Sequence, residues 1–503
     1  MKLLKTLNIE LGTLNLRWAV AALVLAVCND SQAQIQQAWV AHYNNAITSG
    51  TNQAVKMALD SLGNIHVTGF SQNANTNLGY VTIKYAPNGN QLWATRYDST
   101  NFPSATPSAL ALDSSNDVFV TGNALTVKYD PSGNPFWTTP YAGTSLAVDS
   151  NGNSVVTGIS TSFGTVTLNP NGSNLWLATY PSSYGPVVGQ QVLTATDNSV
   201  YVAGYFTYDC NNMGCFETLL VIKYATNGSQ LWTQQWGPEP YGDVQIDGMA
   251  LDFADNLYLV GNFPGEIPKG YATFKYSNNG SLVWMTNPNL NAYSRAAGLV
   301  LESDTNVLVT GKAGNEYPDF FYATFKVNAD GSSLWSNYYP QPPVGVSVAT
   351  SVAVDSANNS YVTGYSPGTN SENDIVTMKY GPNGNQLWLQ RYSSPGDGNA
   401  VGNAIAADNN GNVYVAGYDT TTAGGTEMVL IKYSPVTLQR KPDGTVLLET
   451  QGSPGESFDI QASADLQSWL DLGSVLADTN GLMQFDDTNA PQYNARFYYT
   501  NPQ

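Results

Sequence analysis

The sequence of 503 residues is short of charged and reactive side chains. Only 11% of its residues are charged, with 19 basic against 38 acidic residues, and it contains two histidines and three cysteines. The formal net charge of −19 argues against a nucleic-acid partner, because a surface that binds phosphates must be basic. Self-repulsion of an acidic surface favours a dissolved monomer.

Catalytic motifs are also missing. The sequence contains no H-E-x-x-H, no G-x-S-x-G and no paired C-x-x-C pattern. Its two histidines, His42 and His66, fall in different expected strands, and His66 occupies a position that is Tyr in sister segments. We therefore predict no catalytic residue, and an enzyme is the less favoured class.

Long apolar runs are lacking except near the start of the chain. A basic flank precedes the short apolar run 18–27 (WAVAALVLAV), and small residues precede Gln34. This order predicts a signal peptide over residues 1–33, cleaved after Ala33. An uncleaved anchor or a lipid on Cys28 is the alternative. No later run reaches membrane length, so we expect a secreted or cell-surface protein, with the periplasm also open.

Two cysteines remain after the leader, in the stretch YDCNNMGC. Cys210 and Cys215 are close in sequence, and such a pair in an exported chain predicts one local disulfide. A metal clip is the alternative, but no histidine stands nearby to complete a ligand set.

Repetition is the dominant positive feature. The decapeptide KYAPNGNQLW at 84–93 returns as KYGPNGNQLW at 379–388. It belongs to a longer unit in which two short apolar strands are followed by a variable loop and then by this segment. Each unit has a marker glycine at the end of its second strand, and the eight markers are Gly69, Gly122, Gly158, Gly204, Gly261, Gly311, Gly364 and Gly417.

Each unit is predicted to form four strands, a to d, joined by turns such as DSLGN and PNGN. Asn, Asp and Gly suit these turns, because Gly adopts positive φ without strain. Strand d carries a tryptophan in the first seven units: Trp93, Trp137, Trp176, Trp232, Trp284, Trp335 and Trp388. The pattern predicts an all-β chain.

The eighth unit has no tryptophan after its IKY segment, whereas Trp39 precedes the first unit. Trp39 lies 30 residues before Gly69, and the other Trp-to-Gly distances are 21 to 29 residues. We therefore expect the N-terminal strand to serve as strand d of the last unit. A ring closed in this way is an eight-bladed β-propeller, since closure removes the unpaired edges.

The repeat resembles the SBBP family, the β-propeller repeats of secreted bacterial proteins, through its D-x-x-G-N-x-Y-V-T-G and K-Y-x-x-x-G-x-x-L-W segments. The resemblance covers residues 35–435, and we assign residues 34–435 to the propeller. It weakens in unit three, where the Lys-Tyr pair is missing, and in unit four, where Ala195 replaces the acid. The family description implies seven blades, which stays the alternative to the eight that the markers give.

Charged side chains recur at two fixed places. Nine residues before the marker glycines stand the acids Asp60, Asp113, Asp149, Asp252, Glu302, Asp355 and Asp408. Nine residues before the tryptophans, and at the matching place in unit eight, stand Lys84, Lys128, Lys223, Lys275, Lys326, Lys379 and Lys432. Because every blade carries them, we interpret acids, lysines and tryptophans as structural. A ring of carboxylates that binds Ca²⁺ is the alternative, and otherwise no cofactor is predicted.

The long b–c loops are where a ligand site is expected, because loops on one face of a propeller usually build it. The predicted function is a non-catalytic scaffold that binds a protein or carbohydrate at this loop face or at the channel mouth. The alternative is a propeller enzyme: a lyase, a hydrolase or a quinoprotein-like dehydrogenase.

The repeat rhythm stops after IKYSP, and residues 436–503 are predicted to form a small β-sandwich. The segments FDIQASADLQSW (458–469) and ARFYYTN (495–501) resemble fibronectin-like modules at the ends of exported bacterial proteins. Trp469 and Arg496 are expected to be structural, and a sorting or surface-attachment role is a hypothesis.

Overall fold

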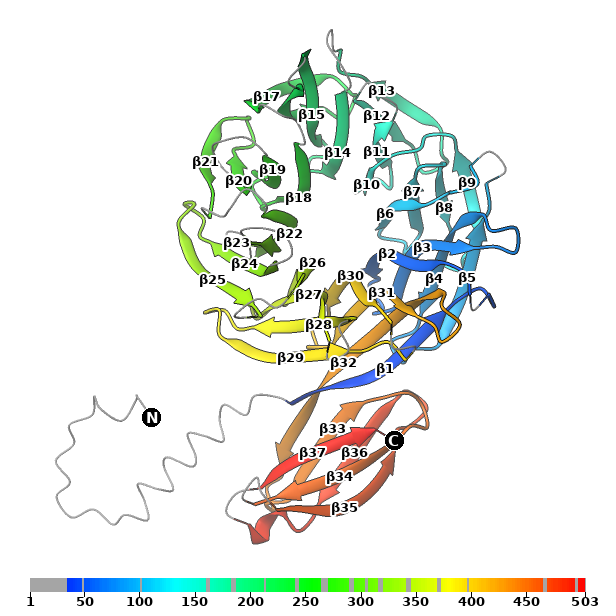
Figure 1. Cartoon of the computed structure of the whole chain (residues 1–503), viewed down its shortest axis with the longest axis vertical. Coiled ribbons are helices and arrows are strands. Elements are labelled where there is room, and N and C mark those ends of the chain that lie inside the picture. The colour runs from blue at the N-terminus through cyan, green and yellow to red at the C-terminus, as the bar shows by residue number, and fades with distance from the viewer. Residues whose placement is uncertain are drawn as a thin grey trace, which may run out of the picture.

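The computed structural model describes residues 34–47, 49–99, 102–159, 163–181, 187–211, 214–239, 244–263, 270–288, 294–303, 306–314, 320–340, 345–368, 372–395, 398–464, 468–493 and 496–502. Small antiparallel sheets lie around a central opening, and a further β module lies beside the ring (Figure 1). The predicted signal peptide, 1–33, lies outside the described residues.

Units one to four form four sheets of four strands. Unit one contains β2 (Asn52–Leu59), β3 (Ile65–Gln72), β4 (Leu78–Tyr85) and β5 (Gln91–Tyr97). Unit two contains β6 (Pro107–Leu112), β7 (Val118–Gly122), β8 (Thr126–Tyr129) and β9 (Pro135–Thr139). Unit three contains β10 (Ser145–Val148), β11 (Ser154–Ile159), β12 (Gly164–Leu168) and β13 (Asn174–Ala178). Unit four contains β14 (Val187–Thr194), β15 (Val200–Asn211), β16 (Gly214–Tyr224) and β17 (Gln230–Glu239).

Units five to seven repeat this arrangement. Unit five contains β18 (Gln245–Leu251), β19 (Leu257–Phe263), β20 (Gly270–Tyr276) and β21 (Leu282–Thr286). Unit six contains β22 (Arg295–Glu302), β23 (Asn306–Ala313), β24 (Phe321–Val327) and β25 (Ser333–Tyr339). Unit seven contains β26 (Val348–Val354), β27 (Ser360–Pro367), β28 (Asn373–Tyr380) and β29 (Gln386–Tyr392). Within the described residues these seven sheets have four strands each, ordered a-b-c-d as in the chain.

The last sheet differs from the others because it has six strands. It contains β30 (Ala400–Ala407), β31 (Val413–Thr420), β32 (Thr426–Arg440), β33 (Val446–Gln451) and β36 (Leu482–Asp487), and β1 (Gln34–Tyr43) pairs with β32. The pairing of β1 is antiparallel and sets Trp39 opposite Lys432. The N-terminal strand thus lies where strand d lies in the other units. We call the junction of β1, β30, β31 and β32 with unit one the seam.

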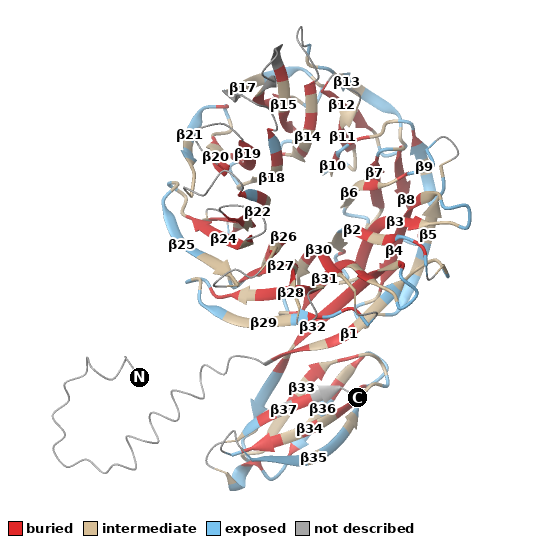
Figure 2. Cartoon of the chain, viewed as in Figure 1, coloured by how far each residue is buried: buried red, intermediate tan, exposed pale blue. Residues whose placement is uncertain are grey.

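The hydrophobic core lies between neighbouring sheets. Strands b and c are almost wholly buried, while the outer strands d are largely exposed (Figure 2). All five residues of β7 are buried, for instance, because sheets pack on both of its faces. At the seam one cluster joins Trp39, Ile65 and Val81 to Tyr414 and Leu430. Each fully buried side chain of this size contributes about 1.5–3 kcal/mol.

The C-terminal module has two facing sheets. One contains the end of β32 with β33 and β36, and the other has the order β35 (Trp469–Leu476), β34 (Ser457–Ser463), β37 (Phe497–Pro502). Leu448, Phe458, Ile460, Met483 and Tyr498 form its core, and η2 (Ala490–Gln492) is a short 3-10 helix. β32 crosses the expected border at 435/436 without a break. No helix within the described ranges is long and apolar enough to cross a membrane.

Candidate functional site

The repeated acids lie in the a–b turns. Asp60 Oδ1 accepts hydrogen bonds from the backbone N–H groups of Leu62 (3.0 Å) and Asn64 (2.8 Å). The same pair of bonds to N–H groups two and four residues later is made by Asp113, Asp149, Asp252, Asp355 and Asp408. These oxygens satisfy turn N–H groups that would otherwise lack a partner.

Most of the repeated lysines pair with these acids. The Nζ–Oδ2 distances are 3.1 Å for Lys84–Asp60, 3.6 Å for Lys128–Asp113, 4.0 Å for Lys275–Asp252 and 3.7 Å for Lys379–Asp355, and Lys326 pairs with Glu302. Burial opposes ionisation of Asp60, but hydrogen bonds from Asn64, Lys84 and His66 prevail and lower its pKa to about 2.

Two lysines have other partners. Lys223, in the unit that lacks the acid, donates to Asn278 Oδ1 in the next unit. Lys432 Nζ donates to Pro87 O (3.0 Å) in unit one and to Gln451 Oε1 (2.5 Å) in the C-terminal module. Burial lowers the pKa of Lys432 to about 8. This lysine therefore links the seam to the module.

The repeated tryptophans join each unit to the next. Trp93 Nε1 donates to Pro131 O at 3.0 Å, in the c–d turn of unit two. Trp137, Trp176, Trp232, Trp284 and Trp335 make the matching bond. Trp39 makes it to Pro87 O of unit one at 3.2 Å. The turn glycine must be small, since a Cβ on Gly133 (φ 85°) would lie 2.5 Å from the ring of Trp93.

A second set of links was not anticipated from the sequence. Most inner strands carry a bulge whose extra residue stands 14 positions before the marker glycine. Four side chains at this position donate to backbone oxygens of the next unit: Ser108 to Gly143 O (2.7 Å), Thr144 to Gly189 O (2.7 Å), Thr350 to Gly402 O (2.5 Å) and Asn403 to Ala54 O (2.8 Å). The last bond crosses the seam.

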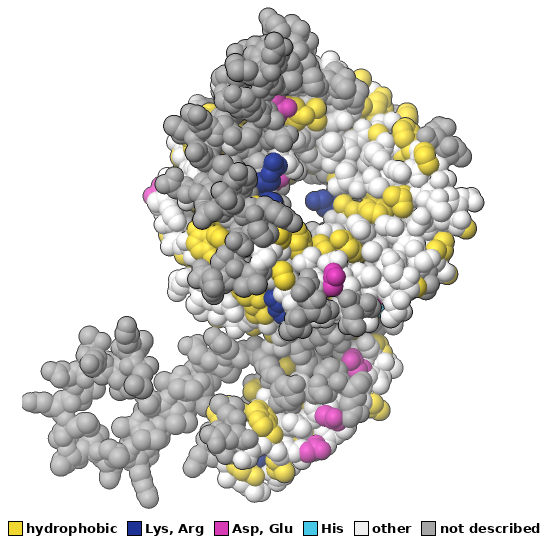
Figure 3. All heavy atoms as spheres, in the orientation of Figure 1, with side chains coloured by type: hydrophobic (Ala, Val, Ile, Leu, Met, Phe, Trp, Pro, Cys, Tyr) yellow, Lys and Arg dark blue, Asp and Glu magenta, His cyan; other side chains and the backbone are white. Residues whose placement is uncertain are grey.

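Charged side chains also lie on the inner strands. Lys56 is on β2, Asp247 on β18 and Arg295 on β22. Lys and Arg side chains gather at the rim of the central opening (Figure 3). Loss of water around Asp247 raises the pKa of its carboxyl group to about 8, although Arg295 and Asn262 oppose the shift. Asp247 occupies the bulge position of unit five.

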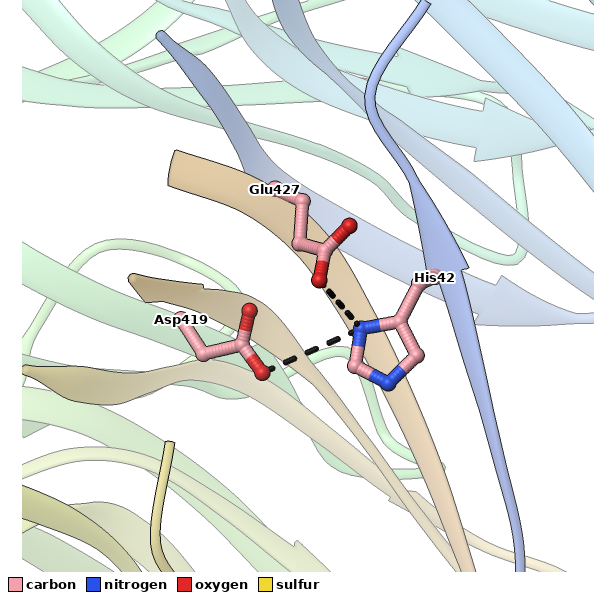
Figure 4. Close-up of side chains that lie close together, drawn as sticks. All are labelled: His42, Asp419 and Glu427. Atoms are coloured by element: carbon pink, nitrogen blue, oxygen red, sulfur yellow. Dashed lines mark ion pairs between the residues drawn. The ribbon is translucent and has the colours of Figure 1, made fainter. Parts of the chain in front are cut away.

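One cluster combines side chains from distant parts of the sequence, and we call it the His42 cluster. It contains His42 at the end of β1, Asp419 at the end of β31 and Glu427 at the start of β32 (Figure 4). His42 Nδ1 lies 3.1 Å from Glu427 Oε1 and 3.8 Å from Asp419 Oδ2. One imidazole thus faces two carboxylates.

The surroundings of the His42 cluster are partly polar. Asp419 is fully buried and accepts a hydrogen bond on Oδ2 from Tyr392 OH at 2.6 Å, and burial raises the pKa of its carboxyl group. Asn44 Nδ2 donates to Glu427 Oε2 at 3.2 Å. Such a group can hold a proton or a cation among three ligand atoms.

Sequence reasoning missed this cluster, although a signal was present. Two residues after the marker glycine the other units have Ser, Ala or Phe, and only unit eight has an acid, Asp419. His42 stands three residues after its tryptophan, where units one and seven have Arg96 and Arg391. Both departures occur in the unit that β1 joins. His66 lies apart, buried beside Asp60 at 3.2 Å.

The predicted disulfide involves side chains that lie outside the described residues. Cys210 and Cys215 are paired residues of β15 and β16. Parts of the long b–c loops, among them 264–269 and 315–319, also lie outside them. In the module, Arg496 pairs with Asp487 and stacks on Tyr493, and Trp469 is 41% exposed.

Comparison with known proteins agrees with this architecture. The sequence model of a family described as "Beta-propeller repeat" (SBBP) matches residues 388–418, from strand d of unit seven into β31 of unit eight. This segment of the chain is therefore similar to a β-propeller repeat. An uncharacterized WD repeat-containing protein of Acanthamoeba polyphaga mimivirus is 26% identical over 424 residues, covering 72% of this chain. The chain spans 27% of the length of that curated relative.

Solved propeller structures are similar at low identity. The WD40 domain of SCAP from fission yeast is 10% identical with a TM-score of 0.46, covering 80% of this chain and 98% of that chain. The Neurospora crassa Pan2 WD40 domain is 11% identical with a TM-score of 0.42, covering 80% of this chain and 96% of that chain.

Proposed function

We propose that this β-propeller repeat protein is an exported, non-catalytic scaffold. In this proposal it has eight blades, β1 completes the last blade, and a protein or glycan binds at the face formed by the b–c loops. The observation that carries the proposal is that the recurring polar side chains already bond within the fold. The acids hold turns, and the lysines and tryptophans contact neighbouring strands and turns.

Three contacts support closure at the seam. Trp39 donates to unit one in the same way that Trp93 donates to unit two. Asn403 bonds across the seam as Thr350 does between units seven and eight. Lys432 reaches Pro87 of the same turn. A blade of β30, β31, β32 and β1 then has the same neighbours as every other blade.

The geometry favours one face for binding. In an antiparallel a-b-c-d sheet, the a–b and c–d turns lie at one end of the strands and the b–c loops at the other. The a–b and c–d turns are short and nearly uniform, as in DSLGN and PNGN. The b–c connections vary from Asn123–Leu125 in unit two to the long excursion of unit four. Variable loops on a fixed frame are the usual site of ligand recognition.

The test is a binding screen with residues 34–503 on glycan and extracellular-protein arrays, followed by titration of each hit. Two variants with equal added charge locate the surface: Asn75→Lys with Thr422→Lys in b–c loops, and Leu62→Lys with Ser132→Lys in the opposite turns. All four side chains are exposed. We expect the loop-face variant alone to weaken binding at least tenfold.

The outcomes separate the alternatives. Equal weakening by both variants, or weakening by the turn-face variant alone, would place the ligand elsewhere. The absence of any saturable ligand would contradict the scaffold function. Turnover of a glycan on the array, detected by mass spectrometry, would replace the scaffold by a propeller enzyme.

We also propose that the C-terminal module is a fibronectin-like sandwich that attaches or sorts the protein. Its two facing sheets and single core support the first part. A truncation must keep β32 to Arg440, since that strand also pairs with β31 and β1. Unchanged cellular location after deletion of residues 441–503 would contradict the attachment role.

A further inference from the structure

We propose that His42, Asp419 and Glu427 bind one divalent transition-metal ion, with Zn²⁺ as the best fit. The ion would join β1 to the ends of β31 and β32, at the loop-face end of the last sheet. This inference does not depend on which ligand, if any, the scaffold binds.

The geometry suits a metal ion of this size. One ligand atom from each residue lies within 4.8 Å of the other two. Zinc bonds to nitrogen and oxygen are about 2.0–2.2 Å long, so ligand atoms of a tetrahedral site lie about 3.3 Å apart. The His42–Glu427 distance of 3.1 Å and the His42–Asp419 distance of 3.8 Å bracket this value. Small side-chain rotations would complete the site.

A buried oxygen without a partner points to a cation. Asp419 is fully buried, and within the described part of the chain its Oδ1 has no hydrogen-bond partner. An unsatisfied carboxylate oxygen in the interior is unfavourable, and a metal ion approached by both oxygens of Asp419, Oδ1 as well as Oδ2, would compensate it. The His42 and Glu427 side chains are 33% and 18% exposed, which leaves a path for the ion and a coordination position for water.

Neighbouring groups orient two of the three ligands. Tyr392 OH donates to Asp419 Oδ2 at 2.6 Å, and Asn44 Nδ2 donates to Glu427 Oε2 at 3.2 Å. Hydrogen bonds of this kind hold ligating carboxylates in place in metal sites. The site would therefore be partly ordered before the metal arrives.

Unit seven shows that the fold itself does not require this cluster. At the positions of His42, Asp419 and Glu427 it has Arg391, Ser366 and Asp374. Arg391 donates to Asp374 Oδ2 at 2.8 Å and to Ser366 Oγ at 3.2 Å. In unit seven a permanently charged arginine thus pairs with one carboxylate, whereas unit eight places two carboxylates beside one imidazole.

The ligand types favour zinc over calcium. Imidazole nitrogen is a good ligand for Zn²⁺ and other late transition metals, whereas Ca²⁺ takes six to eight oxygen ligands. Three protein ligands with one open position match the zinc sites that retain a water molecule.

The experiment uses residues 34–503 produced without a histidine tag, stripped with chelator and titrated calorimetrically with Zn²⁺ and separately with Ca²⁺. We expect one Zn²⁺ per chain, a Zn²⁺-dependent rise in melting temperature, and weaker binding of Ca²⁺. His42→Arg copies unit seven and should fold normally, but should weaken Zn²⁺ binding at least 100-fold. Glu427→Gln should weaken it at least tenfold.

Asp98→Asn is the matched control, because Asp98 is a carboxylate beside strand d of unit one, paired with Arg96 at 2.7 Å. It should leave Zn²⁺ binding unchanged. The proposal would be overturned by the absence of stoichiometric Zn²⁺ binding, by tighter binding of Ca²⁺, or by full binding in His42→Arg. Co²⁺ absorption bands that persist in His42→Arg would equally overturn it. A protonated His42 that merely pairs with the two acids gives the first of these results.

Discussion

The seam and the junction between units seven and eight are joined by the same kind of hydrogen bond, but the charged side chains at their loop-face ends differ. Both are joined by a bulge side chain, Asn403 at one and Thr350 at the other. At the loop-face end, however, unit seven pairs Arg391 with Asp374, whereas unit eight gathers the His42 cluster. Residues at repeated positions therefore hold the sheets together, whereas the candidate metal ligands stand at positions where the sequence departs from the repeat.

The largest expected difference concerns the tryptophans. Trp39 is 4% exposed and bonds to Pro87 O, whereas Trp388 is only half-buried. Trp39→Ala should therefore lower the free energy of unfolding by about 3–5 kcal/mol, and Trp388→Ala by clearly less. Urea unfolding followed by circular dichroism measures both. Equal losses would mean that the deeper burial of Trp39 adds no stability beyond that which Trp388 provides.

Substitutions at Arg391 and at His42 should have different effects on stability. Arg391→Ala leaves Asp374, whose side chain is 11% exposed, without its cation, and should cost about 1–3 kcal/mol. His42→Arg supplies a cation to Asp419 and Glu427 and should change the metal-free stability by less than about 0.5 kcal/mol. Thermal melts in the presence of a chelator compare the two variants. A large loss of stability in His42→Arg would mean that an arginine cannot replace His42 in unit eight as Arg391 occupies that position in unit seven.

The bulge links should be equivalent. Asn403→Ala removes the bond to Ala54 O and Thr350→Ala the bond to Gly402 O, and each should cost about 0.5–1.5 kcal/mol. If Asn403→Ala has no effect while Thr350→Ala does, the seam is not held like an ordinary junction. Denaturation midpoints in urea decide this.

A further expected effect depends on pH. Asp247 occupies in unit five the place of Asn403, and its folded pKa of about 8 lies above the unfolded value of 3.8. The folded state therefore holds a proton that the unfolded state loses, and stability falls as pH rises from about 4 to 8. Asp247→Asn should match the wild type near pH 4 and melt at a higher temperature near pH 8. If the difference in melting temperature between Asp247→Asn and the wild type is the same at pH 4 and pH 8, Asp247 does not titrate in this range.

Much of the fold could be predicted because its repeated residues are chemically restricted. Only glycine fits beneath the ring of Trp93, and an Asp side chain holds most of the a–b turns, so these positions recur visibly. The spacing of Trp39 predicted the pairing of β1, and β1 does pair with β32. Fold class followed from these restrictions.

The rest could not be read in the same way. The bulge position holds Ser, Thr, Gln, Asp or Asn in six units but Val55 in unit one and Ala297 in unit six, so no motif marks it. β32 continues past Pro435 because it finds new partners in β33, which the end of the repeat did not indicate. The His42 cluster escaped notice because its members, at 42, 419 and 427, meet only after the ring is assembled.

The partner of β1 is synthesised long after β1 itself. Residues 34–43 are synthesised early, but β32 begins at Thr426, so β1 has no strand partner until all seven four-stranded sheets have been made. Until residues Met428–Val436 have been synthesised, the strand that carries Trp39 has no partner in the sheet. The turn at Pro87 then lacks its hydrogen bond from Trp39. A chain that ends before β32 would thus keep the edges of β1 and β31 unpaired. These edges could pair with a strand of another molecule or be bound by a chaperone.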